Sequence, residues 1–418
     1  FIQQSKDARK RKYLLTISLV ANLGLLGIFK YLDFFVGSMN HLLDYNGNSF
    51  SFEKFNLILP VGISFYTFQT MSYTFDIYRK KRKPMNSFLS FACYAAFFPQ
   101  LVAGPIVRSE HFEEQIKKPL IFKSKNFKIG LTFILIGLLK KLVVADNVGI
   151  QVNYILNDGE HIQNSLLVWW AALLFGIQIY ADFSGYTDIA LGSAKFFGID
   201  LPKNFDYPYF VTNPQEFWRK WHISLSTWLK DYLYISLGGN RGGKLILIKS
   251  LMLTMMLGGL WHGANWNFML WGFVHGLLLL FHRFFNKYHD ALNKIIPSNK
   301  VKLFVSWLIT QYFIFFTWLI FRVQNFELLK KCISSYLFIG SRIDFMEYIS
   351  YLEINRWSTF LVVFFFIVFH TISYRIGGIK YFLSKDQSGL WGFYMGTILS
   401  IIYFFRPENN PPFIYFQF

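Results

Sequence analysis

A histidine flanked by glycine and tryptophan interrupts the most apolar part of the sequence. The stretch Gly258–Trp266 reads GGLWHGANW and separates two long apolar runs, 245–260 and 268–281. An imidazole inside a membrane-spanning stretch is costly to hold, so an ionisable residue there predicts a functional site. Histidine also works readily as a general base near neutral pH. His262 is therefore the first candidate for chemistry; a helix cap or a hydrogen bond to a backbone carbonyl is the alternative.

The composition predicts a polytopic membrane protein. Of the 418 residues 53% are hydrophobic and 21% aromatic, in runs close to the length of about 20 residues that crosses a bilayer. The net charge of +18 lies in short loops beside these runs, as the positive-inside rule requires, so no nucleic-acid partner is expected. Cys93 and Cys332 are far apart in apolar stretches and predict neither a disulfide framework nor a metal site. Because the chain begins at Phe1 without Met, we expect further spans before it.

Nine apolar runs are long enough to be membrane helices: 13–36, 57–78, 129–147, 165–183, 245–261, 266–282, 303–321, 357–374 and 388–405. The loops between them differ in charge, which assigns them to sides. Residues 1–12 and 79–83 are rich in Lys and Arg and are expected in the cytoplasm. Residues 37–56 and 150–163 carry little or no basic charge and are expected outside.

A tenth apolar run, 86–104, lies between two basic loops, 79–83 and 106–128. If it crossed the membrane, one basic loop would lie on the wrong side. We therefore predict a segment that enters the membrane and returns, broken at Pro99 and Pro105, since such backbone is tolerated only when it is buried in protein.

The same charge pattern makes 245–282 a helical hairpin whose two ends are cytoplasmic and which carries His262. From Lys249 to His262 is 13 residues, or roughly 20 Å of helix rise. The hydrocarbon core is about 30 Å thick. His262 is therefore predicted inside the membrane, beyond its middle as seen from the cytoplasm.

The region 184–243 contains no clean span and is predicted to be an interfacial or cytoplasmic amphipathic region. Within it four apolar residues recur at helical spacing: Trp221, Leu225, Trp228 and Leu229. This spacing predicts an amphipathic helix through 217–234 that lies in the interface or covers a cavity.

Five blocks together resemble the membrane-bound O-acyltransferase (MBOAT) superfamily, in the family's order. They are Ala103–Arg108, Gln178–Asp188, Phe217–Arg241, Trp261–Gly263 and Pro412–Phe418. The most similar branch is the bacterial one of the alginate and peptidoglycan O-acetylation membrane proteins. The resemblance implies an all-α integral membrane fold that forms one polytopic domain over 1–418. It also implies a ring of about nine or more transmembrane helices, with re-entrant and interfacial helices, around a central tunnel.

The resemblance also implies roles for single residues. His262 matches the family's near-invariant histidine, and His222 matches its second active-site position. Acyl transfer to a hydroxyl needs a base and an environment for the developing oxyanion, so His262 is expected to be the base and His222 to support it. Further supporting positions are Asn265, Trp261, Asp182 and Tyr180.

Other polar residues are open to two interpretations. Asp188, near a predicted span end, is either a helix cap or functional. Asp231 either orients a histidine or pairs with a basic neighbour. Packing or snorkelling is expected for the rest: His275, His282, Lys30, Lys140 and Lys141.

Acetyl-CoA is the expected donor, with no metal, and four basic residues are expected to bind its phosphates: Arg219, Lys220, Arg241 and Lys244. The run 238–244 formally matches a phosphate-binding loop, but Leu245 stands where that loop needs Ser or Thr. A glycine-rich anion site and a tight turn with topogenic charges both remain open.

The expected function is a membrane O-acetyltransferase of the bacterial cytoplasmic (inner) membrane. It would move acetyl from a cytoplasmic donor across the membrane to an extracytoplasmic glycan, with peptidoglycan ahead of alginate or another exopolysaccharide. The sequence contains no Gly-Asp-Ser block or G-x-S-x-G elbow, so a separate extracytoplasmic acetyltransferase is the expected partner protein. The alternatives are a transporter of an activated acyl carrier without chemistry of its own, and D-alanyl transfer to teichoic acid.

Overall fold

The computed structural model describes residues 1–47, 50–101, 104–119, 121–157, 159–285, 298–355, 357–378, 388–408 and 413–414. Within these ranges the chain is helical, and the only β-pairing is one isolated bridge between Asn164 and Arg342. Six helical stretches are long and apolar enough to cross a membrane: Ala8–Tyr45, Ser165–Phe196, Gly243–His262, Trp266–Phe285, Asn299–Arg322 and Ser358–Ile376. The predicted all-helical membrane class is confirmed, while the count of nine helices and the ring around a tunnel stay predictions.

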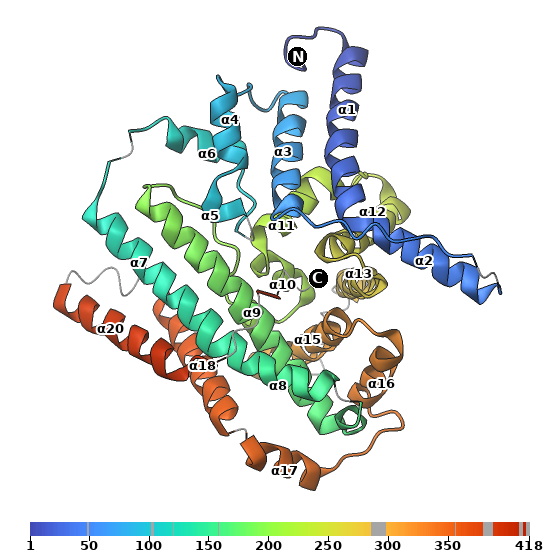
Figure 1. Ribbon diagram of the computed structural model, residues 1–418, viewed down its shortest axis with the longest axis vertical. Helices are drawn as coiled ribbons and strands as arrows, with labels where there is room; N and C mark the ends of the chain where they lie inside the picture. The colour runs from blue at the N-terminus through green and yellow to red at the C-terminus, as the bar shows by residue number, and fades with distance from the viewer. Residues whose placement is uncertain are drawn as a thin grey trace.

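Figure 1 shows the order of the helices. The first half comprises α1 (Ala8–Leu26), η1 (Gly27–Tyr31), α2 (Leu32–Tyr45), α3 (Ile63–Tyr78), α4 (Phe88–Ala95), α5 (Phe98–Leu101), α6 (Ser109–Ile116), α7 (Ser124–Leu138), η2 (Leu139–Ala145), α8 (Asp146–Asn157), η3 (His161–Gln163) and α9 (Ser165–Phe196). The second half comprises η4 (Pro208–Phe210), α10 (Pro214–Lys220), α11 (Ile223–Trp228), η5 (Leu229–Tyr234), α12 (Gly243–His262), α13 (Trp266–Phe285), α15 (Asn299–Arg322), α16 (Phe326–Tyr336), α17 (Phe345–Asn355), α18 (Trp357–Ile376) and α20 (Ser388–Phe405).

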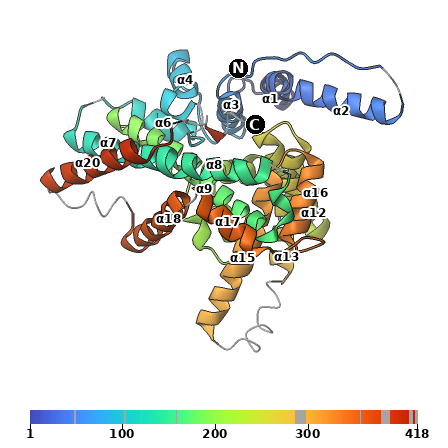
Figure 2. The same cartoon turned by 60° about the horizontal axis from the view of Figure 1, so that its bottom comes forward.

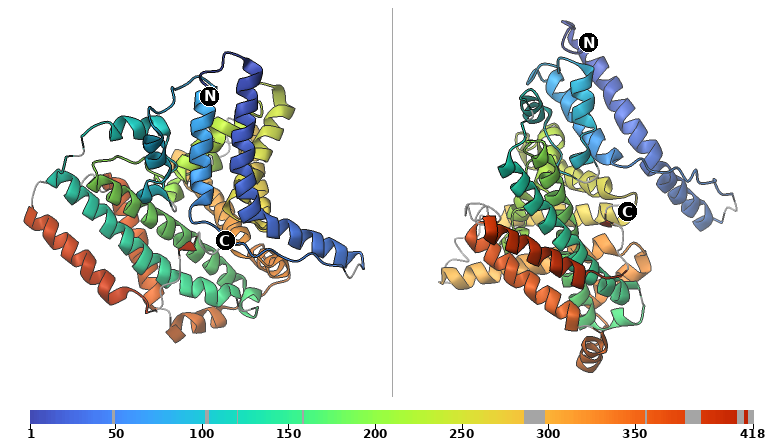
Figure 3. Two further views of the ribbon diagram at one scale, coloured as in Figure 1. Left: turned by 45° about the horizontal axis from the view of Figure 1, so that its top comes forward. Right: turned by 60° about the vertical axis from the view of Figure 1, so that its left-hand side comes forward.

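The N-terminal helix α1 packs antiparallel to α3, and the two lie side by side in both views of Figure 3. Arg11 at the start of α1 donates to the carbonyl oxygen of Tyr78 at the end of α3. Farther along, the Thr70 hydroxyl donates to Asn22 Oδ1 over 2.7 Å. The two basic segments, 1–12 and 79–83, therefore lie at the same end of the pair. The π-helical turn η1 then leads into α2, which projects from the body of the molecule (Figure 2).

The predicted span 57–78 and the predicted re-entrant run 86–104 differ in extent from the helices of the structure. The helix predicted at 57–78 begins only at Ile63, because residues 50–60 have no regular structure and Gly62 adopts a left-handed φ of 76° before the first turn. The run 86–104 is divided into α4 and α5, of eight and four residues. Eight helical residues rise only about 12 Å. The break predicted near Pro99 is therefore present, and α4 alone is too short to cross a bilayer.

Helix α9 is longer than the pattern of apolar residues predicts. The span was expected to end at residue 183, where the amphipathic region would begin, but α9 continues to Phe196. It packs antiparallel against the continuous helix formed by α7, η2 and α8. Helices α7, α8 and α9 run together diagonally across Figure 1.

Ion pairs explain why α9 continues past its charged residues. Lys140 Nζ lies 2.6 Å from Asp188 Oδ2, and Lys141 Nζ lies 3.0 Å from Asp182 Oδ1 and 2.6 Å from Asp146 Oδ1. Both lysines project from the π-helical η2 toward these carboxylates, which offsets the cost of holding charge in an apolar interior. Asp188 lies inside α9 and is therefore not a helix cap, which excludes one of its two interpretations. Both lysines are paired with carboxylates inside the protein, so the expectation that they snorkel is wrong.

Two reciprocal glycine contacts bring α7 and α9 together. A Cβ atom added at Gly192 would lie 2.4 Å from the Gly130 carbonyl oxygen, and one at Gly185 would lie 2.7 Å from the Gly137 carbonyl oxygen. Each helix contributes two glycines seven residues apart, which places them two turns apart on one face. Small residues at such crossings let membrane helix backbones approach closely.

We expect Gly192→Ala to destabilise the protein by about 1–3 kcal/mol, because the added methyl group meets backbone that cannot move aside. Gly24→Ala in α1 is the matched control, since no atom lies within 4 Å of the added Cβ atom and alanine is the better helix former. Thermal unfolding of the purified protein in detergent would measure both. Equal or higher stability of Gly192→Ala would contradict the close approach.

The segment between α9 and α12 does not form the predicted amphipathic helix. Helix α10 ends at Lys220 and α11 begins at Ile223, because His222 between them has a left-handed backbone with φ 40°. The apolar residues whose spacing suggested one helix are all buried in the protein core: Trp221, Leu225, Trp228 and Leu229. Their spacing marks burial within the protein and not contact with lipid.

Candidate active site

The hairpin of α12 and α13 carries His262 as the last residue of α12, where the sequence predicts such a hairpin. The two helices are packed tightly near its tip. A Cβ atom added at Gly259 would lie 2.1 Å from the Phe268 carbonyl oxygen, and one at Gly263 would lie 2.1 Å from the Phe268 ring. From the exposed Gly243 to His262 the helix rises about 28 Å. The glycines around the histidine thus allow a narrow tip at the far end of a long helix.

Aromatic rings surround the His262 imidazole, whose residue is only 5% exposed. The ring centroids of Trp261, Trp271 and Phe321 lie 5.1, 5.3 and 5.4 Å from it, in edge-to-face geometry. These rings come from α12, α13 and α15. Three helices therefore fix the orientation of the imidazole and exclude bulk water from it.

His222 lies at the break between α10 and α11 and is completely buried. A left-handed backbone at a residue other than glycine costs about 1–3 kcal/mol and persists only where the surroundings hold it. Asn204 supplies that hold. Its carbonyl oxygen accepts from the Ile223 N–H over 2.9 Å, and its side-chain oxygen accepts from the Ser224 N–H over 3.2 Å.

The His222 ring has an apolar environment. Its centroid lies 4.6 Å from the Phe183 ring, and in the described part of the chain neither ring nitrogen has a hydrogen-bond partner. Burial lowers the pKa of His222 to about 3, so the imidazole is neutral at physiological pH. A neutral imidazole offers one N–H donor and one acceptor nitrogen.

The structure brings the two predicted histidines together around one indole. The Trp261 ring lies 5.9 Å from the His222 ring and 5.1 Å from the His262 ring, with both imidazoles at steep angles to it. Two residues that are 40 positions apart in the sequence thus form one buried polar site.

The left-handed backbone at residue 222 leads to a test with two matched variants. In ordinary backbone glycine is less stable than alanine by about 0.5–1 kcal/mol. His222→Gly and His222→Ala both remove the imidazole, but only glycine adopts φ 40° without strain. We therefore expect His222→Gly to be the more stable of the two, by about 1 kcal/mol, in thermal unfolding. A more stable alanine variant would show that the turn is not strained.

The supporting residues at the hairpin tip have internal partners. The Trp261 indole N–H donates to the Ser64 carbonyl oxygen over 3.4 Å, and Asn265 Oδ1 accepts the Asn267 N–H over 3.0 Å as the N-terminal cap of α13. The buried Asn267, which the sequence did not single out, donates its side-chain N–H to the Val323 carbonyl oxygen after α15. Its only signal in the sequence is that it is a second asparagine, two residues after Asn265 at the hairpin tip.

Asp182 and Tyr180 lie on α9, close in sequence to Phe183, whose ring contacts His222. Asp182 Oδ2 accepts the Ile414 N–H over 2.7 Å, which ties the described C-terminal residues to α9. Phe413 then packs 4.9 Å from the Tyr186 ring. Of the C-terminal block singled out in the sequence only Phe413 and Ile414 lie among the described residues, and both are buried. The Tyr180 ring belongs to a neighbouring cluster: Phe205, Tyr209, Trp221, Phe366 and His370.

The four basic residues expected to bind the donor do not form one cluster. Arg241 and Lys244 are exposed at the start of α12, at the opposite end of that helix from His262. Arg219 is exposed on α10, and Lys220 is paired with Glu216 over 3.2 Å. The run that contains Arg241 has a positive φ at three glycines, as in a tight turn: Gly238, Gly239 and Gly243.

Asp231 and two further histidines also have clear surroundings. Asp231 pairs with Arg108 over 3.0 Å, so it does not orient a histidine. His275 is buried and packs at 4.7 Å from the Trp271 ring, and His370 packs at 5.1 Å from Tyr180. His370 lies in the long apolar run of α18, and nothing in its spacing distinguishes it from a packing residue.

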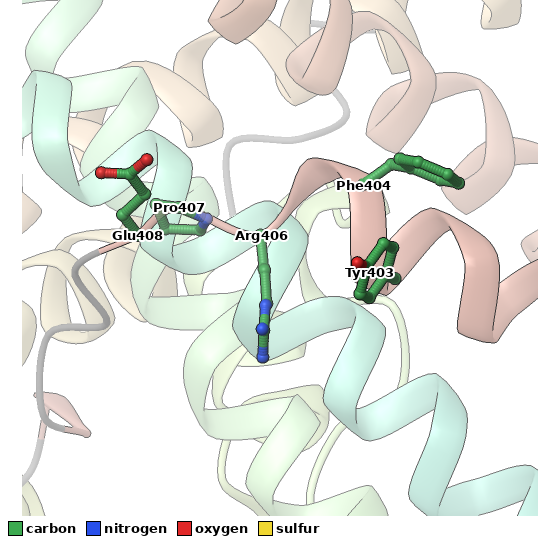
Figure 4. A pocket seen from close by; sticks show the side chains of 5 residues that line it. All are labelled: Tyr403, Phe404, Arg406, Pro407 and Glu408. Carbon is green, nitrogen blue, oxygen red and sulfur yellow. The ribbon is translucent and has the colours of Figure 1, made fainter.

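Two surface hollows lie away from the histidines. One of about 430 Å³ lies at the end of α20 (Figure 4) and is lined by Tyr403, Phe404, Arg406, Pro407 and Glu408. The other, of about 280 Å³, is lined by Leu156, Asn157, Arg322, Val323, Gln324, Asn325 and Leu328. Arg322, which lines the second hollow, directly follows Phe321, and the Phe321 ring contacts His262. Neither is lined by His222 or His262.

The fold and the site define a helical membrane protein with two buried imidazoles near the tip of a helical hairpin. Residues 48–319 match the model of the MBOAT, membrane-bound O-acyltransferase, family, and the chain belongs to this family. It is 38% identical over 355 residues to a peptidoglycan O-acetyltransferase of Helicobacter pylori, covering 78% of this chain and 64% of that protein.

Two further relatives bear different names. An alginate O-acetylase of Azotobacter vinelandii is 39% identical over 316 residues, covering 75% of this chain and 60% of the relative. A teichoic acid D-alanyltransferase of Bacillus subtilis is 30% identical over 288 residues, covering 65% and 71%. The chain spans about three fifths of the length of the two acetylating relatives.

Proposed function

We propose that this protein is an acyltransferase that moves an acetyl group from a cytoplasmic donor to a hydroxyl acceptor on the far side of the membrane. The observation that carries the proposal is the pair of buried imidazoles, His222 and His262, which both contact the Trp261 ring. Membership of the MBOAT family supports it. So does the position of His262 at the far end of α12 from the basic loops.

In the proposed reaction the acceptor hydroxyl oxygen attacks the acyl carbonyl carbon while His262 takes the hydroxyl proton. The tetrahedral oxyanion that forms needs a nearby donor, and the neutral His222 ring is suited to provide one. Collapse of the intermediate breaks the carbon–sulfur bond of the thioester, and His262 returns the proton to the departing sulfur. The aromatic rings around the site keep water from competing with the acceptor.

We propose acetyl-CoA as the donor and the exposed Arg241 and Lys244 as the groups that attract its phosphates at the cytoplasmic end of α12. Arg219 on α10 is a further candidate. Lys220 contributes less, because Glu216 already pairs with it. No metal ion is required by this chemistry.

For the acceptor we propose an extracytoplasmic glycan, with peptidoglycan ahead of alginate, because the relatives at 38% and 39% identity bear these names. Delivery through a separate extracytoplasmic acetyltransferase, from the bacterial inner membrane, is part of the proposal. The ring of helices and central tunnel would provide the path. D-alanyl transfer to teichoic acid is the second candidate, because the relative at 30% identity carries that name.

The central test is His262→Gln, which keeps polarity but removes the base. We expect normal insertion and folding, and a loss of transfer of about 10²–10⁴-fold, which is typical for a general base. O-acetyl ester content of cell-envelope glycans, measured by mass spectrometry in cells with equal protein levels, provides the readout. A transporter without chemistry would keep its function in this variant, and normal acetylation would therefore exclude the enzyme.

The donor assignment has its own test. Arg241→Ala and Lys244→Ala should each raise the KM for acetyl-CoA several-fold with a smaller effect on kcat, since a contact that binds donor and transition state equally is lost. They should also weaken the salt dependence of KM, because a charge contact is removed. Lys203→Ala is a control, since this exposed lysine pairs with Asp206 at 2.9 Å. An unchanged KM for acetyl-CoA in both variants would show that 238–244 is a turn that does not bind the donor.

A further inference from the structure

The end of α12 that carries His262 is capped by a lysine from the N-terminal helix. Lys30 Nζ donates to the carbonyl oxygens of Trp261 over 2.6 Å and His262 over 3.2 Å, and to the Ser64 hydroxyl oxygen over 3.3 Å. An ammonium group has three donors. All three are therefore used, and two of them hold the helix end that bears the candidate base.

The adjacent Tyr31 completes the cap. Its hydroxyl donates to the Leu260 carbonyl oxygen over 2.7 Å. The last four carbonyl groups of a helix lack partners within it. Here three consecutive carbonyl groups, those of Leu260, Trp261 and His262, find donors on η1.

The local fold explains how two adjacent side chains reach one helix end. Lys30 and Tyr31 lie in η1, a π-helical turn between α1 and α2. In a regular α-helix, neighbouring residues point about 100° apart, and the wider turn changes that placement. Single π-turns occur frequently at functional sites. The antiparallel pairing of α1 with α3 brings η1 to the depth of Ser64, where α12 ends.

The charge of Lys30 suits the place where it lies. A cation at the C-terminal end of a helix is stabilised by the helix dipole. In the described part of the chain no carboxylate pairs with Lys30, so the helix end is its counterpart. A charged residue in an intramembrane helix is costly and marks function by default. This lysine therefore does more than snorkel, which corrects the expectation from the sequence.

We propose that Lys30, with Tyr31, is a positioning residue for the reaction: it fixes the end of α12 so that the His262 imidazole meets the acyl carbonyl in the reactive geometry. The proposal rests on the proposed function of His262. It assigns a part in catalysis to a helix that precedes the matched family region 48–319. Lys30 itself does not contact the reacting atoms.

The test is Lys30→Met, which keeps the length of the side chain but removes its donors and charge. A displacement of about 1 Å in a reactive group can cost on the order of 10²-fold in rate. We expect kcat to fall about 10–100-fold with KM for acetyl-CoA within about threefold. Radiolabelled acetyl transfer from acetyl-CoA to cell-envelope material, in membranes with equal amounts of the full chain, would measure both.

Two variants separate positioning from a general loss of structure. Lys30→Arg keeps the charge and the donors and should recover part of the lost kcat, and Tyr31→Phe, which loses one donor, should cause a smaller loss. Lys12→Met is the matched control, because this exposed lysine lies at the other end of α1. It should behave as the wild type.

A double-mutant cycle shows whether Lys30 acts through His262. In the His262→Gln background Lys30→Met should cause no further loss, whereas independent roles would multiply the losses. The positioning role is overturned if Lys30→Met has wild-type kcat, if its defect lies in KM, or if a fall in thermal stability accounts for the lost activity. Activity of His262→Gln would instead overturn the proposed function. An inactive His262→Gln beside a fully active Lys30→Met would overturn the positioning role alone.

Discussion

A polar group inside an apolar, membrane-sized interior must find its partners within the protein, and this constraint organises the structure. Because water is not available to satisfy donors, acceptors or charges, several buried polar groups bond to distant parts of the chain and hold them in place. Lys140 and Lys141 hold α9 against η2, and Asn204 holds the backbone that follows His222. Lys30 holds the end of α12. The helices are thus arranged by a small number of polar contacts in an otherwise apolar core.

The features that depend on composition and local periodicity could be predicted from the sequence. The helical membrane class follows from long apolar runs, and the bounds of α15 and α18 agree with the runs that predict them to within a few residues. The hairpin around His262 is visible in the sequence as two apolar runs, each with basic residues at its outer end. The break in 86–104 follows from proline chemistry at Pro99. These signals lie within about twenty residues of the element that they specify.

The features that depend on distant partners could not be predicted. Asp188 has the sequence signature of a helix end, but a lysine 48 positions earlier neutralises it and the helix continues. The hydrogen bond from Lys30 to the Trp261 carbonyl joins residues 231 positions apart. His222 sits at a left-handed turn that its own neighbours do not favour, because Asn204 imposes it from another segment. Periodicity places Trp221 on a helix face, yet it cannot show that the helix stops there.

The paired glycines of α7 and α9 have a mechanical consequence. The two close contacts lie seven residues apart on each helix. If either helix slid or rotated by a fraction of a turn, backbone atoms would clash at both contacts. Intermediate positions are therefore blocked, and these two helices must move as one rigid strut. Any opening that admits donor or releases product has to occur at other contacts.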